Sequence, residues 1–354
     1  MAGGAAQPLI SFVGYTRNDG YAYAFEKRLV VSAVSLADQA ERFQLSLELV
    51  LVEWNPPSDQ RSVASLFADF KGNPYFSLRV ITVPSGFHRG FRGADEKGLH
   101  PARALNVGYR RARGQFFTPF ASDAILDDKV LQFIKDEGLD TANIYRLNRA
   151  DVPESLLDSL DPDDFNRAKL LEAIEGSERY LHAPLDHDMS FHYGVKPLHT
   201  NACGDFLLMS SAAWHRQRGQ RENTDVACLD TDSIALHAAA ANGLREVRLP
   251  ADCMLYKISH GRTYRHRVKP HRKGYRRVLE QVVNGIVPHR PTRALIRALF
   301  DIPRRQVAGL TGHFPSMERN FILWARLWQW RSSDVRLNGP SWGLKGETLK
   351  ETEF

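Results

Sequence analysis

Residues 47–52 read Leu-Glu-Leu-Val-Leu-Val, and the last four of these positions are all apolar. A strand with one face in solvent alternates apolar and polar residues, whereas a parallel strand covered on both faces is apolar almost throughout. Similar short runs at residues 9–14, 78–83 and 116–120 are separated by segments with a helical pattern. This alternation predicts an α/β fold with a mostly parallel sheet and helices on both of its faces.

The clearest helical segment covers residues 101–113. Pro101 suits a first helical turn, Leu105 and Tyr109 recur on one face, and Gly114 can end the helix. Farther along the chain, the pattern indicates a strand at residues 206–209, a helix at residues 232–241 and a strand at residues 244–249.

The composition excludes several classes of protein. The chain has 354 residues, 43% of them hydrophobic, which is enough for one large domain or two smaller ones. Its three cysteines contain no close pair, which argues against a disulfide framework or a four-thiolate zinc site. No basic leader is present, and no apolar run approaches the roughly 20 residues that cross a bilayer. We therefore expect a cytoplasmic protein, and its net charge of +6 favours anionic partners.

Polar side chains follow three of the predicted strands. In an open α/β sheet, ligands bind at the carboxyl ends of the strands, so these positions are candidates for a binding site. They are Arg17 after the first run, which ends at the candidate residue Gly14, Glu53 and Asn55 after the second, and Ser122 and Asp123 after the fourth. No GxxxxGK[ST] or GxGxxG loop follows a strand, which argues against P-loop NTPases and dinucleotide-dependent dehydrogenases.

Residues 104–126 read ALNVGYRRARGQFFTPFASDAIL. Together with the strand-end residues, this string resembles the GT-A glycosyltransferases, in particular the family 2-like enzymes, over roughly residues 9–265. In that family, a helix with an Asn and a Gly leads to a strand that ends in a D-x-D metal motif. Asn106, Gly108 and Gly114 match the helical part, and Asp123 matches the second Asp. Ala121 replaces the first Asp, so the motif is degenerate.

The resemblance implies a Rossmann-like GT-A sheet that binds a nucleotide-diphosphate sugar, expected to be UDP-linked. It also implies that Asp123 and the late His260 hold Mn²⁺ or Mg²⁺, which stabilises the charge of the leaving diphosphate. Glu53 stands where the family contacts the nucleotide base, and Arg103 starts the helix of Asn106. The donor-binding residues expected from the resemblance are Gly14, Arg17, Glu53, Asn55, Arg103, Asn106 and Ser122.

Two later strings, CGDFLLMSSAAW and CLDTDSIALHAAAANGL, resemble the acceptor half of the family. The resemblance implies that Asp232 is the general base that takes a proton from the acceptor hydroxyl, with Asp230 as its competitor. Asp205 is expected to hydrogen-bond the acceptor. Inversion at the anomeric carbon would follow, while retention stays open.

The expected domain plan places a glycosyltransferase domain at residues 1–268. Within it, a nucleotide-sugar half extends to about residue 125, an insertion covers about 151–200, and an acceptor half covers about 200–268. A mainly helical region is expected at residues 269–354. The segment 262–277 is rich in Lys and Arg interleaved with aromatic residues, a pattern that suits a nucleotide diphosphate, an anionic glycan, RNA or peripheral contact with an anionic membrane surface, and that also occurs on a solvated face. No nucleic-acid-binding motif is present, and the oligomeric state stays open.

These observations predict a metal-dependent, inverting glycosyltransferase acting on a saccharide or glycolipid acceptor. Two alternatives remain. A nucleotidyltransferase shares the nucleotide-binding α/β plan but attacks phosphorus. A non-catalytic protein that binds sugar nucleotides or glycans would explain the missing first Asp of the motif.

Overall fold

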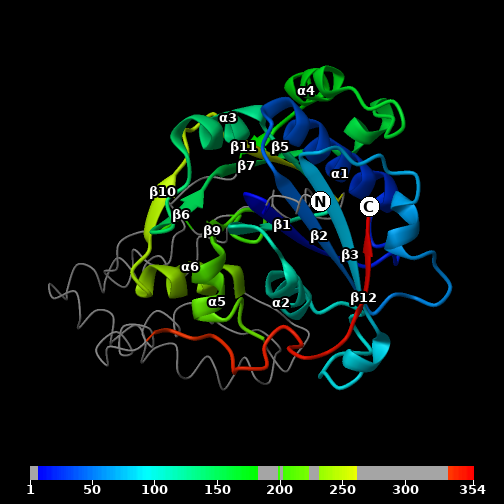
Figure 1. The fold of residues 1–354 in the computed structure, drawn as a ribbon. Helices are drawn as coiled ribbons and strands as arrows, with labels where there is room; N and C mark the ends of the chain where they lie inside the picture. Colours follow the sequence, from blue (N-terminus) through cyan, green and yellow to red (C-terminus); the bar gives the residue numbers. More distant parts are fainter. Residues whose placement is uncertain (1–6, 182–197, 200–201, 223–230, 261–333) are drawn as a thin grey trace, which may run out of the picture.

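The computed structural model describes residues 7–181, 198–199, 202–222, 231–260 and 334–354. Over these residues its main sheet has eight strands in the order β10-β6-β9-β4-β1-β2-β3-β12 (Figure 1). Strands β4, β1, β2 and β3 are parallel to one another, whereas β9 and β12 run antiparallel to their neighbours. The bounds are β1 (Ile10–Thr16), β2 (Leu47–Trp54), β3 (Phe76–Val83), β4 (Phe116–Phe120), β6 (Asn143–Arg146), β9 (Leu208–Ser210), β10 (Arg245–Arg248) and β12 (Lys350–Glu353).

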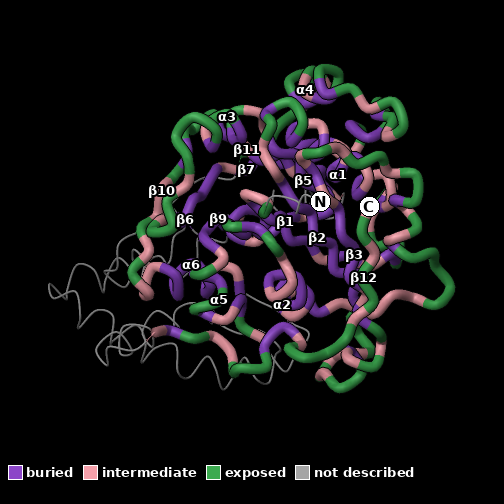
Figure 2. The backbone as a smooth tube through the Cα atoms, in the orientation of Figure 1, coloured by how far each residue is buried: buried purple, intermediate pink, exposed green. Residues whose placement is uncertain are grey.

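Helices cover both faces of the main sheet, because its central strands are apolar on both sides. Alternate residues of β1 point to opposite faces, so Phe12 packs in the same cluster as Leu29 of α1, whereas Val13 packs with Val107 of α2. The main helices are α1 (Phe25–Phe43), α2 (Pro101–Arg111), α5 (Ser211–Gln217) and α6 (Thr231–Ala241). Figure 2 shows the buried strands between these layers. The predicted α/β class and the mostly parallel central sheet are confirmed.

Gly108 explains how closely α2 approaches the sheet. A Cβ atom at this position would lie 2.3 Å from Val13 Cγ1 and 3.2 Å from Val52 Cγ2. The absence of a side chain therefore lets the helix backbone rest directly on β1 and β2. This contact fixes the height of α2 above the carboxyl ends of these strands.

A second, smaller sheet has the order β5-β11-β7-β8 over the described residues. Its strands are β5 (Ala124–Leu126), β11 (Met254–Ile258), β7 (Asn148–Val152) and β8 (Tyr180–Leu181), and α3 (Asp128–Glu137) follows β5. In the predicted insertion, the structure places the end of β7, a 3₁₀ helix (Glu154–Ser159), α4 (Arg167–Glu175) and β8. Residues 182–197 and 200–201 of the insertion lie outside the described residues.

The end of the chain differs from the predicted helical region. Residues 261–333, which include the basic segment 262–277, lie outside the described residues. The described end, residues 334–354, contains the strand β12, which pairs antiparallel with the edge strand β3. Arg79 of β3 contacts Glu351 of β12 at 2.6 Å. The segment Lys-Glu-Thr-Glu has no apolar pattern, so pairing with an available sheet edge, and not burial of its side chains, makes it a strand.

Within the described part of the chain, no helix is long and apolar enough to cross a membrane.

Candidate functional site

A cavity of about 510 Å³ lies beyond the carboxyl ends of β1 and β4. The strand order reverses there, since β1 is followed on one side by β2 and on the other by β4. This is the usual position of a ligand crevice in an open α/β sheet. The cavity is lined by Tyr15, Thr16, Arg17, Asp19, Tyr21, Glu96, Lys97, Gly98, Leu99, Pro101, Ala121, Ser122, Asp123, Lys257 and His260.

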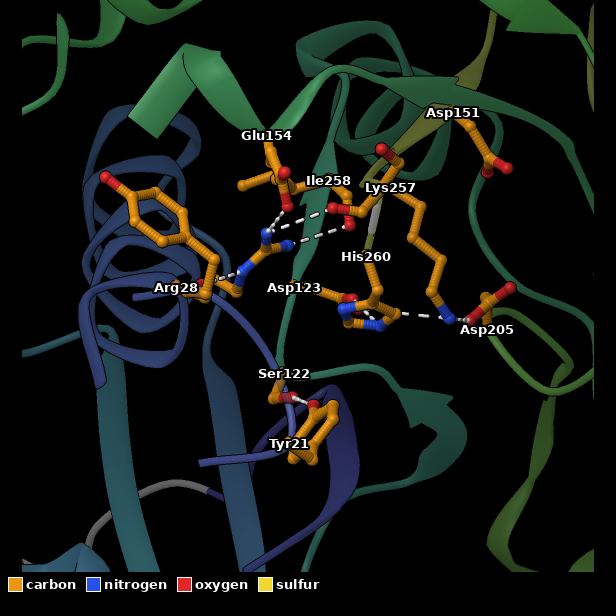
Figure 3. Close-up of polar contacts among 12 residues, drawn as sticks. Tyr21, Arg28, Ser122, Asp123, Asp151, Glu154, Asp205, Lys257, Ile258 and His260 are labelled. Carbon is orange, nitrogen blue, oxygen red and sulfur yellow. Dashed lines mark hydrogen bonds and ion pairs between the residues drawn. The ribbon is translucent and has the colours of Figure 1, made fainter. Parts of the chain in front are cut away.

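Strand pairing brings Asp123 and His260 together. Asp123 directly precedes β5, and β5 pairs antiparallel with β11, so the Ile258 amide donates to the Asp123 carbonyl at 3.0 Å. His260 follows two residues later, and its Nε2 atom lies 2.7 Å from Asp123 Oδ2 (Figure 3). The two residues that the sequence predicted as metal ligands therefore line the same wall of the cavity.

The Asp123 carboxylate is buried, and its two oxygens face different neighbours. Oδ1 lies 3.9 Å from the Lys257 ammonium. Oδ2 receives no hydrogen bond of acceptable geometry from the described residues, although His260 Nε2 is only 2.7 Å away. A carboxylate oxygen and an imidazole nitrogen are ligands that suit Mn²⁺-type ions, so this pair could form one edge of a metal site. Among the described residues, no group of three or more His, Cys, Asp or Glu side chains could hold a metal ion. A metal ion bound by Asp123 and His260 would therefore take its other ligands from substrate or water.

A buried chain of charges continues from the cavity into the second sheet. Lys257 Nζ contacts Asp205 Oδ1 at 2.7 Å, Asp205 also pairs with Arg149, and Arg149 contacts Asp151 at 3.0 Å. Burial alone would raise the pKa of Asp205, but Lys257 and Arg149 outweigh it and hold the pKa well below its ordinary value. Burial likewise lowers the pKa of Lys257, but Asp205 and Asp123 reverse this effect and raise it above its ordinary value. Asp205, Lys257 and Arg149, whose pKa is also raised above its ordinary value by Asp205 and Asp151, are therefore charged at neutral pH.

Arg28 of α1 holds the segment that carries His260. Its guanidinium is fully buried and donates to the carbonyls of Tyr23 at 2.7 Å, Ile258 at 3.0 Å and Ser259 at 3.0 Å (Figure 3). It also contacts Glu154 at 3.4 Å. Because the last two carbonyls directly precede His260, Arg28 positions the histidine from behind.

Tyr21 lies at the cavity wall and is 51% exposed. Its hydroxyl is 3.2 Å from Ser122 Oγ, and its ring packs edge-on against the His260 ring at 5.4 Å between centroids. An exposed aromatic side chain beside a cavity can stack against a ring of a bound ligand.

Arg17 lines the cavity as expected. Its Nη1 contacts Asp19 at 2.6 Å, and its Nε donates to the Asn55 carbonyl at 2.8 Å. Asn55 in turn donates through its side chain to the Gly98 carbonyl at 2.9 Å. Asn55 therefore supports the loop at one side of the cavity and is not one of the lining residues.

Gly14 and Glu53 lie behind the cavity wall and do not line it. Glu53 is fully buried, and its carboxylate accepts from the Val63 amide at 2.8 Å and the Thr82 hydroxyl at 3.3 Å. Burial raises the pKa of Glu53 above its ordinary value. At Gly14, a Cβ would lie 3.0 Å from both Leu51 Cδ2 and the Phe120 carbonyl oxygen, so close strand packing accounts for this glycine.

Arg103 and Asn106 point toward a different segment of the chain. Asn106 is buried; it accepts from the Gln220 amide at 2.7 Å and donates to the Gln220 carbonyl at 2.7 Å. Arg103 contacts Glu222 at 3.3 Å and lies over the Phe91 ring at 4.4 Å. Both side chains thus tie α2 to residues 220–222, and neither lines the cavity.

Asp232 lies in the first turn of α6 and is partly exposed. Its carboxylate accepts from the Ser233 amide at 2.9 Å and lies next to Gly204, where a Cβ would be 3.0 Å from Asp232 Oδ2. Desolvation of the carboxyl raises its pKa, and the nearby charge of Asp205 adds to this effect. Asp232 does not line the cavity. Asp230 lies outside the described residues.

Sequence reasoning missed Lys257, Arg149, Asp151 and Arg28. The available signal was a single charged residue inside an otherwise apolar string, as in Met-Leu-Tyr-Lys-Ile at residues 254–258. Such a charge inside a buried strand requires a partner.

The fold and the cavity define an α/β protein with a ligand crevice at the carboxyl edge of its central sheet. No protein-family model matches the sequence, and no curated protein matches it. Among solved structures, the chain is similar to S. aureus TarS 1-349, with 17% identity, a TM-score of 0.41 and coverage of 73% of this chain and 62% of that chain.

Two structures of the same S. aureus protein with a bound ligand are also similar to this chain. The structure of TarS 1-349 with UDP-GlcNAc has 17% identity, a TM-score of 0.41 and coverage of 71% of this chain and 58% of that chain. The structure with UDP has 16% identity, a TM-score of 0.40 and coverage of 71% and 60%. The chain thus spans less than two thirds of the length of these structures.

Proposed function

We propose that this chain is a metal-dependent, inverting glycosyltransferase that moves a sugar from a UDP-linked donor to a saccharide or glycolipid acceptor. The observation that carries the proposal is the convergence of Asp123 and His260, 2.7 Å apart, in a cavity at the carboxyl edge of the sheet. These two residues were selected from the sequence because they resemble the metal ligands of GT-A enzymes. Their convergence supports, by an independent route, the role that the resemblance implies.

The charge of the cavity supports the use of a metal ion. Its described lining contains three cationic residues, Arg17, Lys97 and Lys257, and three acidic residues, Asp19, Glu96 and Asp123. These six residues together therefore carry no net formal charge. A diphosphate brings at least two negative charges, so a divalent cation held by Asp123 and His260 would supply the missing positive charge and stabilise the leaving group.

In this proposal, Asp232 removes the proton of the acceptor hydroxyl. A partly desolvated carboxylate with a raised pKa is a stronger base than an ordinary aspartate, which suits this role. Asp205 is held in ion pairs with Lys257 and Arg149. It therefore contributes fixed negative charge near Asp232, and its predicted hydrogen bond to the acceptor requires one of its oxygens to remain accessible.

The first test is calorimetric titration of UDP with and without Mn²⁺. We expect Mn²⁺ to tighten UDP binding to the wild-type chain by about tenfold or more, and Asp123→Ala to lose this enhancement because a metal-binding carboxylate is removed. Asp252→Ala is the matched control, since Asp252 is exposed and pairs with the exposed Lys129 at 3.0 Å. An equal Mn²⁺ effect in wild type and Asp123→Ala would contradict the metal role.

A second candidate function is non-catalytic binding of a sugar nucleotide. The observation that favours it is Ala121, which lines the cavity where the family's motif has an acid. Under this alternative, UDP would still bind, but no UDP-sugar would be turned over with any acceptor or with water. Release of pyrophosphate from a nucleoside triphosphate would instead identify a nucleotidyltransferase.

A further inference from the structure

Lys257 is the charged side chain that joins the cavity to the buried charges behind it. Its ammonium lies 2.7 Å from Asp205 Oδ1 and 3.9 Å from Asp123 Oδ1, and the side chain is 23% exposed at the cavity wall. Figure 3 shows its side chain extending toward Asp205, with Asp123 and His260 on its other side. A ligand held against Asp123 and His260 would thus meet this ammonium.

The second sheet determines this position. Lys257 is paired with Ala124 of β5 on one side and with Asp151 of β7 on the other. Its backbone is therefore fixed by both neighbouring strands, and only the side chain can change partner. Asp123 directly precedes Ala124 in the sequence, so the register places the ammonium beside this carboxylate.

Arg149 makes a change of partner feasible. Asp205 is paired with Arg149 as well as with Lys257, and Arg149 is itself buried. If the ammonium turned toward another anion, Asp205 would keep a cationic partner. A buried carboxylate that lost its only partner would be strongly destabilised, so this second pairing removes the main cost of such a movement.

We propose that Lys257 is a donor-binding residue whose ammonium turns from Asp205 to the diphosphate of the nucleotide, and that it provides a share of the nucleotide affinity that needs no metal. The inference rests on the proposed function, because it takes a nucleoside diphosphate as the ligand. This role of Lys257 also accounts for Ala121, which replaces an acidic residue of the motif. Because Ala121 brings no carboxylate into the cavity, the charge of Lys257 stays available to the phosphates.

The test is titration of UDP in EDTA, with uridine as the probe that lacks phosphate. We expect the wild-type chain to bind UDP in EDTA and Lys257→Gln to bind it at least about tenfold more weakly, as expected for loss of a charge-assisted hydrogen bond. Lys257→Arg should keep most of the affinity, because it retains the charge. Uridine should bind wild type and Lys257→Gln equally.

Lys129→Gln is the matched control, because Lys129 is an exposed lysine that also pairs with an aspartate, Asp252. It should bind UDP like the wild type. If wild type binds UDP with Mn²⁺ but not in EDTA, the inference is wrong and the proposed function stands. If UDP binds under neither condition, the proposed function fails first. Should Lys257→Gln not fold, Lys257→Arg and the wild-type titration in EDTA still decide the question.

Discussion

Replacement of Arg28 by alanine is expected to lower the free energy of unfolding by about 3–5 kcal/mol. The guanidinium is fully buried and donates to the carbonyls of Tyr23, Ile258 and Ser259. Alanine would leave these three carbonyls without their donor, and each buried unsatisfied group costs about 1–3 kcal/mol, reduced where water can enter. Urea denaturation followed by circular dichroism measures the change.

Arg42→Ala provides the control on the same helix. Arg42 is about half exposed and pairs with Asp38 at 3.5 Å and with Asp128 at 2.7 Å. Exposed ion pairs contribute about 0–1 kcal/mol, so this variant should change the free energy of unfolding by no more than that. If Arg28→Ala and Arg42→Ala lowered the free energy of unfolding equally, the hydrogen bonds of the buried guanidinium would not stabilise the fold as proposed.

The Arg28 variant also tests how His260 is positioned. Because the Ile258 and Ser259 carbonyls lose their donor, the end of β11 should become less well fixed and His260 should move relative to Asp123. We expect the Mn²⁺ enhancement of UDP binding to decrease in Arg28→Ala at temperatures where the variant is still folded. Arg42→Ala should keep the enhancement.

Asp232→Asn is expected to reduce the turnover of a UDP-sugar by about a hundredfold or more while leaving UDP binding unchanged. The amide cannot accept a proton from the acceptor hydroxyl, and Asp232 lies outside the lining of the nucleotide cavity. The measurement is the rate of UDP release from a UDP-sugar that the wild type turns over, together with UDP calorimetry. Asp252→Asn is the control at an exposed aspartate.

The pH profile gives a second readout of the same residue. Desolvation raises the folded-state pKa of Asp232 above the ordinary value of 3.8, and only the deprotonated carboxylate can act as a base. Turnover should therefore fall as the pH decreases through a pKa that lies above 3.8. Full activity down to pH 3.8 in the wild type, or unchanged turnover in Asp232→Asn, would contradict the assignment of this residue as the base.

Much of the fold could be predicted from local pattern. The apolar run at residues 49–52 became part of β2, which is buried along its whole length between β1 and β3. Pro101 begins α2, as its missing amide hydrogen allows. The strand β12 could not be predicted, because an edge strand with mainly polar side chains has no periodic signal and depends on the exposed edge of β3.

The candidate site was predictable only in part. Asp123 and His260 could be selected separately through the resemblance to GT-A enzymes, and each follows a strand-like segment. Glu53, Arg103 and Asn106 occupy the expected places in the sequence, but their side chains contact other parts of the protein. Which side chain points into a cavity depends on helix and strand orientation, and a linear motif does not contain that information.

The sequence by itself determined the α/β class, the parallel central strands and the residues that lie at the carboxyl edge of the sheet. These features depend on local periodicity and on strand polarity, which are properties of short segments. Only the tertiary structure decided that β5 pairs with β11, that Lys257 lies between Asp123 and Asp205, and that Arg28 holds the segment before His260. These contacts join residues far apart in the chain. The pairing of buried charges depends on the register between strands, which no short segment specifies.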